Sequence, residues 1–178
     1  MIEWLKIVSL SVVAAVAYGI LHDLVTAHLA LEYFTIAHPP VFSTQNPILL
    51  AFGWGVIATW WVGLGLGVML ASCARLGHWP RLGLRSVSSR ILGLIAWMAG
   101  TAILSGSAGS ILMASGMNVI GFWTSEIPAG RHVPFAAAVW AHSASYLVGI
   151  LGGLLVCWRT ASERQKRSYD YSSSSMSQ

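Results

Sequence analysis

Apolar residues dominate four long stretches of the chain, at about residues 4–21, 47–74, 90–114 and 134–158, and shorter polar segments separate them. A helix needs about 20 mainly apolar residues to cross a bilayer. Each stretch is therefore long enough to span a membrane. The pattern predicts an all-α membrane protein, in which residues 1–159 form one domain, a bundle of four transmembrane helices.

Several helix boundaries can be predicted from local signals. Asn46 is suited to cap the second span, and Pro47 suits its first position, where no backbone donor is needed. Ser89 is expected to cap the third span, and Gly116 to stop it. Pro134 is expected to open the fourth span.

Two polar segments lie outside these spans. HDLVTAHLALEYFTIAHPP (22–40) keeps a helical period but contains charges, which predicts an extra helical segment on the outer face, stopped by Pro39 and Pro40. Residues 160–178 are charged and then Ser-rich, without a hydrophobic period. We expect them to form a disordered cytoplasmic tail whose basic part contacts anionic lipid.

Composition and charge support the membrane assignment and give it a direction. Residues are 56% hydrophobic and 9% charged, whereas soluble domains carry about 25% charged residues. The formal charge of +4 is divided unevenly, because Arg131 alone lies at the end opposite to the other basic residues of the bundle. By the positive-inside rule, both termini and the 74–90 loop are cytoplasmic. The expected partner is the lipid bilayer, not nucleic acid. The cytoplasmic basic residues are Lys6, Arg75, Arg81, Arg85, Arg90, Arg159, Arg164, Lys166 and Arg167.

Small residues recur at a spacing of four in the third and fourth spans. Helices associate in lipid through close backbone approach at such positions. The stripes therefore predict tight helix contacts, and they leave open whether the partner helix belongs to the same chain or to another copy in a homo-oligomer. The residues are Ala102, Gly106 and Ser110, and Ala141, Ser145, Gly149 and Gly153.

Most of the histidines and carboxylates fall on the predicted outer side, where ionisable residues at membrane depth are functional candidates. His22 and Asp23 lie near the outer boundary of the first span. His142 follows Pro134 by eight positions, about 12 Å into the outer half of the membrane, where it needs a hydrogen-bond partner. His22 and Asp23 can supply that partner. Two plainer interpretations stay open: His142 bonded to one neighbour for packing alone, and Asp23 as the cap of a helix that starts at Leu24. Serines of the third span are also at the right depth for His142, namely Ser107, Ser110 and Ser115.

The segment between the first two spans adds further candidates. His28 and Glu32 are spaced i, i+4, which allows a salt bridge or two ligands for one metal ion. His38 is held extended by the following proline and is placed to fold back over the mouth of the bundle. A transition-metal site would need His22, Glu32, His38 and His142 to converge. The same residues together with Asp23 form the alternative, a metal-free site for proton relay or for binding a polar ligand.

Four motifs carry a resemblance to known sequences: YGILHD (18–23), EYFT (32–35), HP (38–39) and FGWGVIATWWVG (52–63). They resemble a family of bacterial multi-pass inner-membrane proteins to which no activity is assigned. The resemblance implies a bacterial inner (cytoplasmic) membrane location. It includes His22, Asp23, Glu32 and His38 in the pattern and does not include His28.

Two functional hypotheses follow. The first is an outer-facing His/carboxylate site in the mouth of the bundle. The second is a non-catalytic scaffold or accessory subunit, whose small-residue stripes dock against a larger membrane complex. The sequence leaves open whether the protein is an enzyme. The two hypotheses differ on whether His22, Asp23 and His142 lie within hydrogen-bond range of one another.

Overall fold

The computed structural model describes residues 1–176, which contain helices and no strand. Four helices are long and apolar enough to cross a membrane, which confirms the predicted fold class. Three short helical elements lie between them. The long helices are α1 (Ile2–Leu29), α3 (Pro47–Arg75), α4 (Leu84–Ala114) and α6 (His132–Met176), and the short elements are α2 (Glu32–Thr35), α5 (Trp123–Glu126) and the 3₁₀ turn η1 (Ala129–Arg131).

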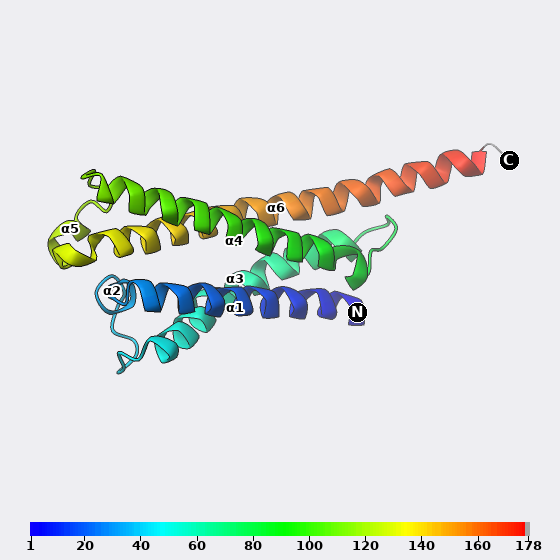
Figure 1. Cartoon of the computed structure of the whole chain (residues 1–178). Coiled ribbons are helices and arrows are strands. Elements are labelled where there is room, and N and C mark those ends of the chain that lie inside the picture. Colours follow the sequence, from blue (N-terminus) through cyan, green and yellow to red (C-terminus); the bar gives the residue numbers. More distant parts are fainter. Residues whose placement is uncertain (177–178) are drawn as a thin grey trace.

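The long helices are arranged as two pairs. α1 packs mainly against α3, and α4 packs mainly against α6, while lighter contacts between α1 and α4 and between α3 and α6 join the pairs. The chain begins at the end of the bundle where α6 extends beyond the other helices (Figure 1). We call this the arginine end (residues 1–10, 73–90 and 156–170). The opposite end, with both long connections, is the histidine end (residues 22–46 and 115–142).

Close backbone approach holds each pair together. A methyl group at Gly55 of α3 would lie 2.6 Å from the backbone nitrogen of Ile20 in α1. A methyl group at Gly106 of α4 would lie 3.1 Å from the carbonyl oxygen of Ala137 in α6. Gly106 belongs to one of the predicted small-residue stripes, which therefore packs against a helix of the same chain.

Two helix boundaries are confirmed by their geometry. The Asn46 side chain accepts hydrogen bonds from the backbone N–H groups of Ile48 and Leu49, so Asn46 caps α3. Gly116 follows the end of α4 with φ +91°, the left-handed conformation that glycine adopts readily. α6 begins at His132, two residues before Pro134.

Two other boundaries differ from the prediction. α1 does not stop near residue 21 but continues to Leu29, because His22 and Asp23 find partners inside the bundle. Asp23 therefore lies within a helix and does not cap a new one. α4 begins at Leu84, so Ser89 lies inside it, and the Leu84 N–H is satisfied by the carboxylate of Glu3 at 3.0 Å.

The tail also differs from the prediction. α6 continues through residues 160–176, which were expected to be disordered, and residues 177–178 lie outside the described part of the chain. The Arg164 side chain is only 1% exposed and anchors this extension. Arg90 of α4 adds an ion pair with Glu163. The Arg164 guanidinium donates to three backbone carbonyls, those of Cys73, Trp79 and Pro80.

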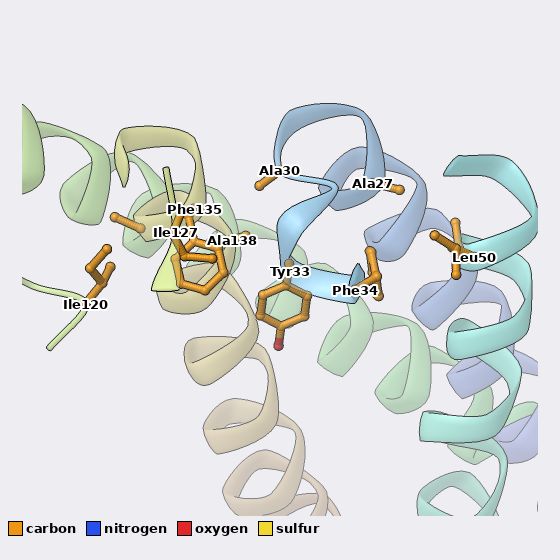
Figure 2. Packing of buried hydrophobic residues seen from close by; sticks show 11 residues of the cluster. Ala27, Ala30, Tyr33, Phe34, Leu50, Ile120, Ile127, Phe135 and Ala138 are labelled. Carbon is orange, nitrogen blue, oxygen red and sulfur yellow. The ribbon is translucent and has the colours of Figure 1, made fainter. Parts of the chain in front are cut away.

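A hydrophobic cluster closes the histidine end and joins the two connections to the helices (Figure 2). Tyr33 of α2 lies within it, with ring contacts to Phe34 and to Phe135 of α6. Figure 2 shows the Tyr33 side chain extending from α2, with its hydroxyl pointing in among the helices. The cluster thus fixes the short helix α2 above the polar residues of α1 and α6.

Candidate functional site

His22 and Asp23 of α1 meet His142 of α6 inside the bundle. The Oδ1 atom of Asp23 lies 3.1 Å from Nε2 of His142, and Nε2 of His22 lies 3.2 Å from Nδ1 of the same ring. Asp23 is 6% exposed and His142 is 3% exposed. The structure therefore selects His22 and Asp23, out of the candidates considered from sequence, as the partners of His142.

The partners of the two histidines determine where the protons lie. Nδ1 of His142 is also 2.9 Å from the carbonyl oxygen of Ala138, which can only accept a hydrogen bond. This nitrogen therefore carries a proton, which it shares with Nε2 of His22. Since Nε2 of His22 accepts, a neutral His22 carries its own proton on Nδ1.

One hydrogen-bond donor among His22, Asp23 and His142 is unused. Nδ1 of His22 has no hydrogen-bond partner, whereas every fully buried side-chain nitrogen or oxygen in the described part of the chain has one. Nδ1 of His22 is therefore accessible, and His22 lines a cavity inside the bundle. The arrangement is a chain that runs from Asp23 through His142 to His22 and ends on a free N–H group.

Aromatic and hydroxyl side chains surround these three residues. The Tyr18 ring stacks on His22 with centroids 5.6 Å apart, and its hydroxyl hydrogen-bonds to the Ser145 hydroxyl at 2.7 Å. Tyr146 meets His142 edge-on at 6.0 Å. No role in the site was predicted for Tyr18 or Tyr146, although Tyr18 is four positions before His22 and Tyr146 four positions after His142, which places each pair on one helical face.

Tyr33 and His38 connect this cluster to the cap of the bundle. The Tyr33 ring lies 4.2 Å from the ring of His142, and burial raises the pKa of Tyr33 well above its usual value, so its hydroxyl stays protonated. The Nδ1–H of His38 donates to the Tyr33 carbonyl at 2.6 Å, and the His38 ring contacts Trp54. His38 thus folds back, as its position before Pro39 suggested, but it contacts Tyr33 rather than joining the His22–His142–Asp23 chain.

Glu32 has a different role from the one considered for it. Its carboxylate pairs with Arg131, at 2.7 Å and 3.2 Å, and the same guanidinium donates to the Leu29 carbonyl. Burial alone would raise the pKa of Glu32, but hydrogen bonds from Arg131 outweigh it and lower the pKa below 4.5. His28 is exposed and donates to the Leu24 carbonyl. Glu32 therefore joins α2 to η1, the turn directly before α6.

The proposed metal ligands are not gathered into one group. Of His22, Glu32, His38 and His142, only His22 and His142 hydrogen-bond to each other. Glu32 is held by Arg131, and Nδ1 of His38 by a backbone carbonyl. Within residues 1–170, no three His, Cys, Asp or Glu side chains are arranged to hold a metal ion. The donor geometry favours hydrogen bonding and proton exchange over metal coordination.

A cavity of about 480 Å³ separates the two helix pairs, and all four long helices line it. His22, Asp23 and His142 form its polar end, and the remainder is mainly apolar. Three of its lining side chains are exposed at the surface of the protein, Trp61 of α3 and Tyr146 and Ile150 of α6. The cavity therefore opens sideways between α3 and α6, toward the surface that lipid would cover.

Comparisons with known proteins assign no family to this arrangement. No protein-family model, no curated protein and no solved structure matches the chain. The resemblance of residues 18–63 to bacterial inner-membrane proteins therefore stays a prediction.

Proposed function

We propose that this membrane protein binds a membrane-soluble small molecule in the cavity between its helix pairs and exchanges a proton with the polar group of that molecule through His22, His142 and Asp23. The observation that carries the proposal is the buried hydrogen-bonded chain of these residues, which ends on a free N–H at the cavity wall. Ionisable groups at membrane depth are costly to keep, so a chain of three of them is a functional candidate.

The order of donors and acceptors permits a proton to move in two steps. The Asp23–His142 pair holds one proton between Oδ1 and Nε2, and has no net charge wherever that proton lies. With His142 as imidazolium, its Nδ1 proton passes to Nε2 of His22, and the Nδ1 proton of His22 passes to a ligand oxygen. Both imidazoles then end neutral, Asp23 remains a carboxylate, and the ligand has gained one proton.

The sideways opening determines where the ligand comes from. Trp61 and Ile150 lie near the middle of α3 and α6, so the opening faces the apolar part of the bilayer. A molecule dissolved in the membrane can reach the cavity without crossing water. The contacts among His22, Asp23 and His142 favour such a site over the scaffold hypothesis, in which these side chains would be scattered or singly bonded.

We further propose that the membrane is a bacterial inner membrane and that the arginine end is cytoplasmic. Basic residues concentrate at the arginine end, and the positive-inside rule places such ends in the cytoplasm. Single cysteines introduced at positions 81 and 126 test the orientation with a membrane-impermeant reagent. Labelling of position 126 from outside supports it, and labelling of position 81 from outside would refute it.

The ligand itself can be detected with lipid extract and native mass spectrometry. Wild type, His142→Ala and His28→Ala are purified, exposed to a total bacterial lipid extract, and compared for adducts of small mass. His28 is a matched control, because it is a histidine of the same helix as His22 but faces outward. We expect wild type and His28→Ala to keep an adduct that His142→Ala loses. Identical adducts in all three proteins would contradict the proposal, and stoichiometric co-purification with another membrane protein would instead support an accessory subunit.

A further inference from the structure

The cavity wall limits the charge that a ligand can carry. This inference deepens the binding part of the proposed function above, by naming the class of ligand, and rests on it. Lysine and arginine are absent from the described residues of the wall, and its one carboxylate, Asp23, is already paired with His142. A charged head group would therefore be buried without a counter-charge, which is strongly unfavourable. The polar group of the ligand is uncharged.

The polar end of the cavity also limits the shape of the head group. Four of its lining side chains carry rings, those of Tyr18, His22, His142 and Tyr146. Aromatic rings stack favourably on other planar rings, in offset or edge-on arrangements. Nδ1–H of His22 is a free hydrogen-bond donor at this end of the cavity, so a ligand that bonds to it presents an acceptor. A planar, uncharged ring with a carbonyl oxygen satisfies both requirements.

The remainder of the cavity has room for a single apolar chain. Along α1 its wall extends from His22 to Ser11, and along α6 from His142 to Cys157. With a rise of about 1.5 Å per residue, these distances are roughly 16 Å and 22 Å. One leaflet contributes about 15 Å of hydrocarbon. The cavity thus continues from the ring-lined end toward the arginine end for at least the depth of one leaflet.

We propose that the ligand is a quinone, a planar uncharged ring that carries a single apolar tail. One ring carbonyl accepts a hydrogen bond from Nδ1–H of His22, and the ring lies against Tyr18 and Tyr146. The tail passes Gly149 and Gly153 of α6 toward Cys157. The proposal concerns binding alone: His22 donates a hydrogen bond to the ring carbonyl and keeps its proton, and no electron is transferred.

The test uses the full chain in phosphatidylcholine nanodiscs and decylubiquinone as the probe, with tetradecanol and myristate as comparison probes. Native mass spectrometry counts the bound probe. We expect one decylubiquinone per chain, and at least tenfold weaker binding of myristate, whose head group is charged. His22→Ala removes one hydrogen bond and is expected to weaken quinone binding about tenfold. His28→Ala is expected to leave binding unchanged.

A second pair of variants tests the path of the tail. Gly149→Leu places a side chain in the cavity, where the nearest atoms belong to the flexible end of Met98. Gly100→Leu is its control, because Gly100 is exposed and has no atom within 4 Å of an added Cβ. We expect Gly149→Leu to abolish quinone binding and Gly100→Leu to preserve it. Ile95→Trp narrows the cavity from α4 and gives the same test should Gly149→Leu fail to fold.

The outcomes separate this inference from the proposed function. Binding of decylubiquinone that depends on His22 and Gly149 supports it. Binding of tetradecanol or myristate that depends on His22, without binding of decylubiquinone, overturns the quinone class and leaves the proton-exchange site standing. Absence of any His22-dependent binding of the three probes also overturns the quinone class, and the lipid-extract comparison of wild type with His142→Ala then decides whether the site itself stands.

Discussion

Removal of the His142 ring is the most informative perturbation of the buried cluster. In His142→Ala, the Asp23 carboxyl loses its Oδ1 partner while it remains buried. Breaking a buried pair in a soluble protein costs about 3–5 kcal/mol, whereas single hydrogen bonds within a membrane average about 0.6 kcal/mol. We expect a loss between these values, about 2–3 kcal/mol in the free energy of unfolding, because one charge-assisted bond and the ring contact with Tyr33 are lost together.

Asp23→Asn is the matched perturbation of the other partner. The asparagine amide can donate to Nε2 of His142, and Nδ1–H of His142 keeps the Ala138 carbonyl. We therefore expect a loss below about 1 kcal/mol. His28→Ala serves as the surface control and is expected to stay within about 0.5 kcal/mol of wild type.

Reversible unfolding in bilayer-like nanodiscs, measured by steric trapping, gives these three free energies. The expected order of destabilisation is His142→Ala, then Asp23→Asn, then His28→Ala. Equal stability of His142→Ala and His28→Ala would refute the buried pair. A larger loss for Asp23→Asn than for His142→Ala would refute the assignment of donors and acceptors.

Three further predictions concern the frame around the site. Gly55→Ala forces α1 and α3 apart and is expected to lower the free energy of unfolding by about 1–3 kcal/mol. Gly65→Ala has no atom within 4 Å of the added Cβ and is expected to change it little, and thermal unfolding compares the two variants. Arg164→Gln removes donors from three backbone carbonyls and is expected to expose residues 160–176 to protease, whereas Arg159→Gln, at an exposed position, leaves the digestion pattern unchanged. The pKa of Glu32 is lowered in the folded state, so its ion pair contributes about 1 kcal/mol or less at neutral pH, and this contribution is lost as the pH falls through the lowered pKa. Glu32→Gln is therefore expected to flatten this part of the pH profile of unfolding. An unchanged profile would contradict the ion pair.

The parts of the fold that follow from local sequence could be predicted. Apolar stretches of membrane-spanning length indicated all four long helices, and Asn46 marked the start of α3 through its own side chain. The depth of His142 below the start of its helix placed it level with His22 and Asp23, because the helical rise is constant. A prediction of contact needed only that α1 and α6 be neighbours.

The parts that depend on distant partners could not be predicted. The spacing of Glu32 pointed to His28 on the same turn, but its partner is Arg131, 99 positions away. Composition pointed to a disordered tail, yet Arg164 anchors it to carbonyls of the α3–α4 region. A helical segment was expected within residues 22–40, but the position of Tyr33 depends on its contacts with Phe135 and His142 of α6, which no local pattern indicates.

The proposed proton exchange requires that the hydrogen bonds run in one direction, from Asp23 through His142 to His22. Nitrogen-15 NMR of histidine-labelled protein in nanodiscs, with single histidine substitutions to assign the signals, reports which ring nitrogen carries a proton. We predict a proton on Nδ1 of His142 and, in neutral His22, a proton on Nδ1 with an unprotonated, hydrogen-bonded Nε2. A neutral His22 protonated on Nε2 would refute this assignment, because the hydrogen bonds would then run in the opposite direction and leave no donor facing the cavity.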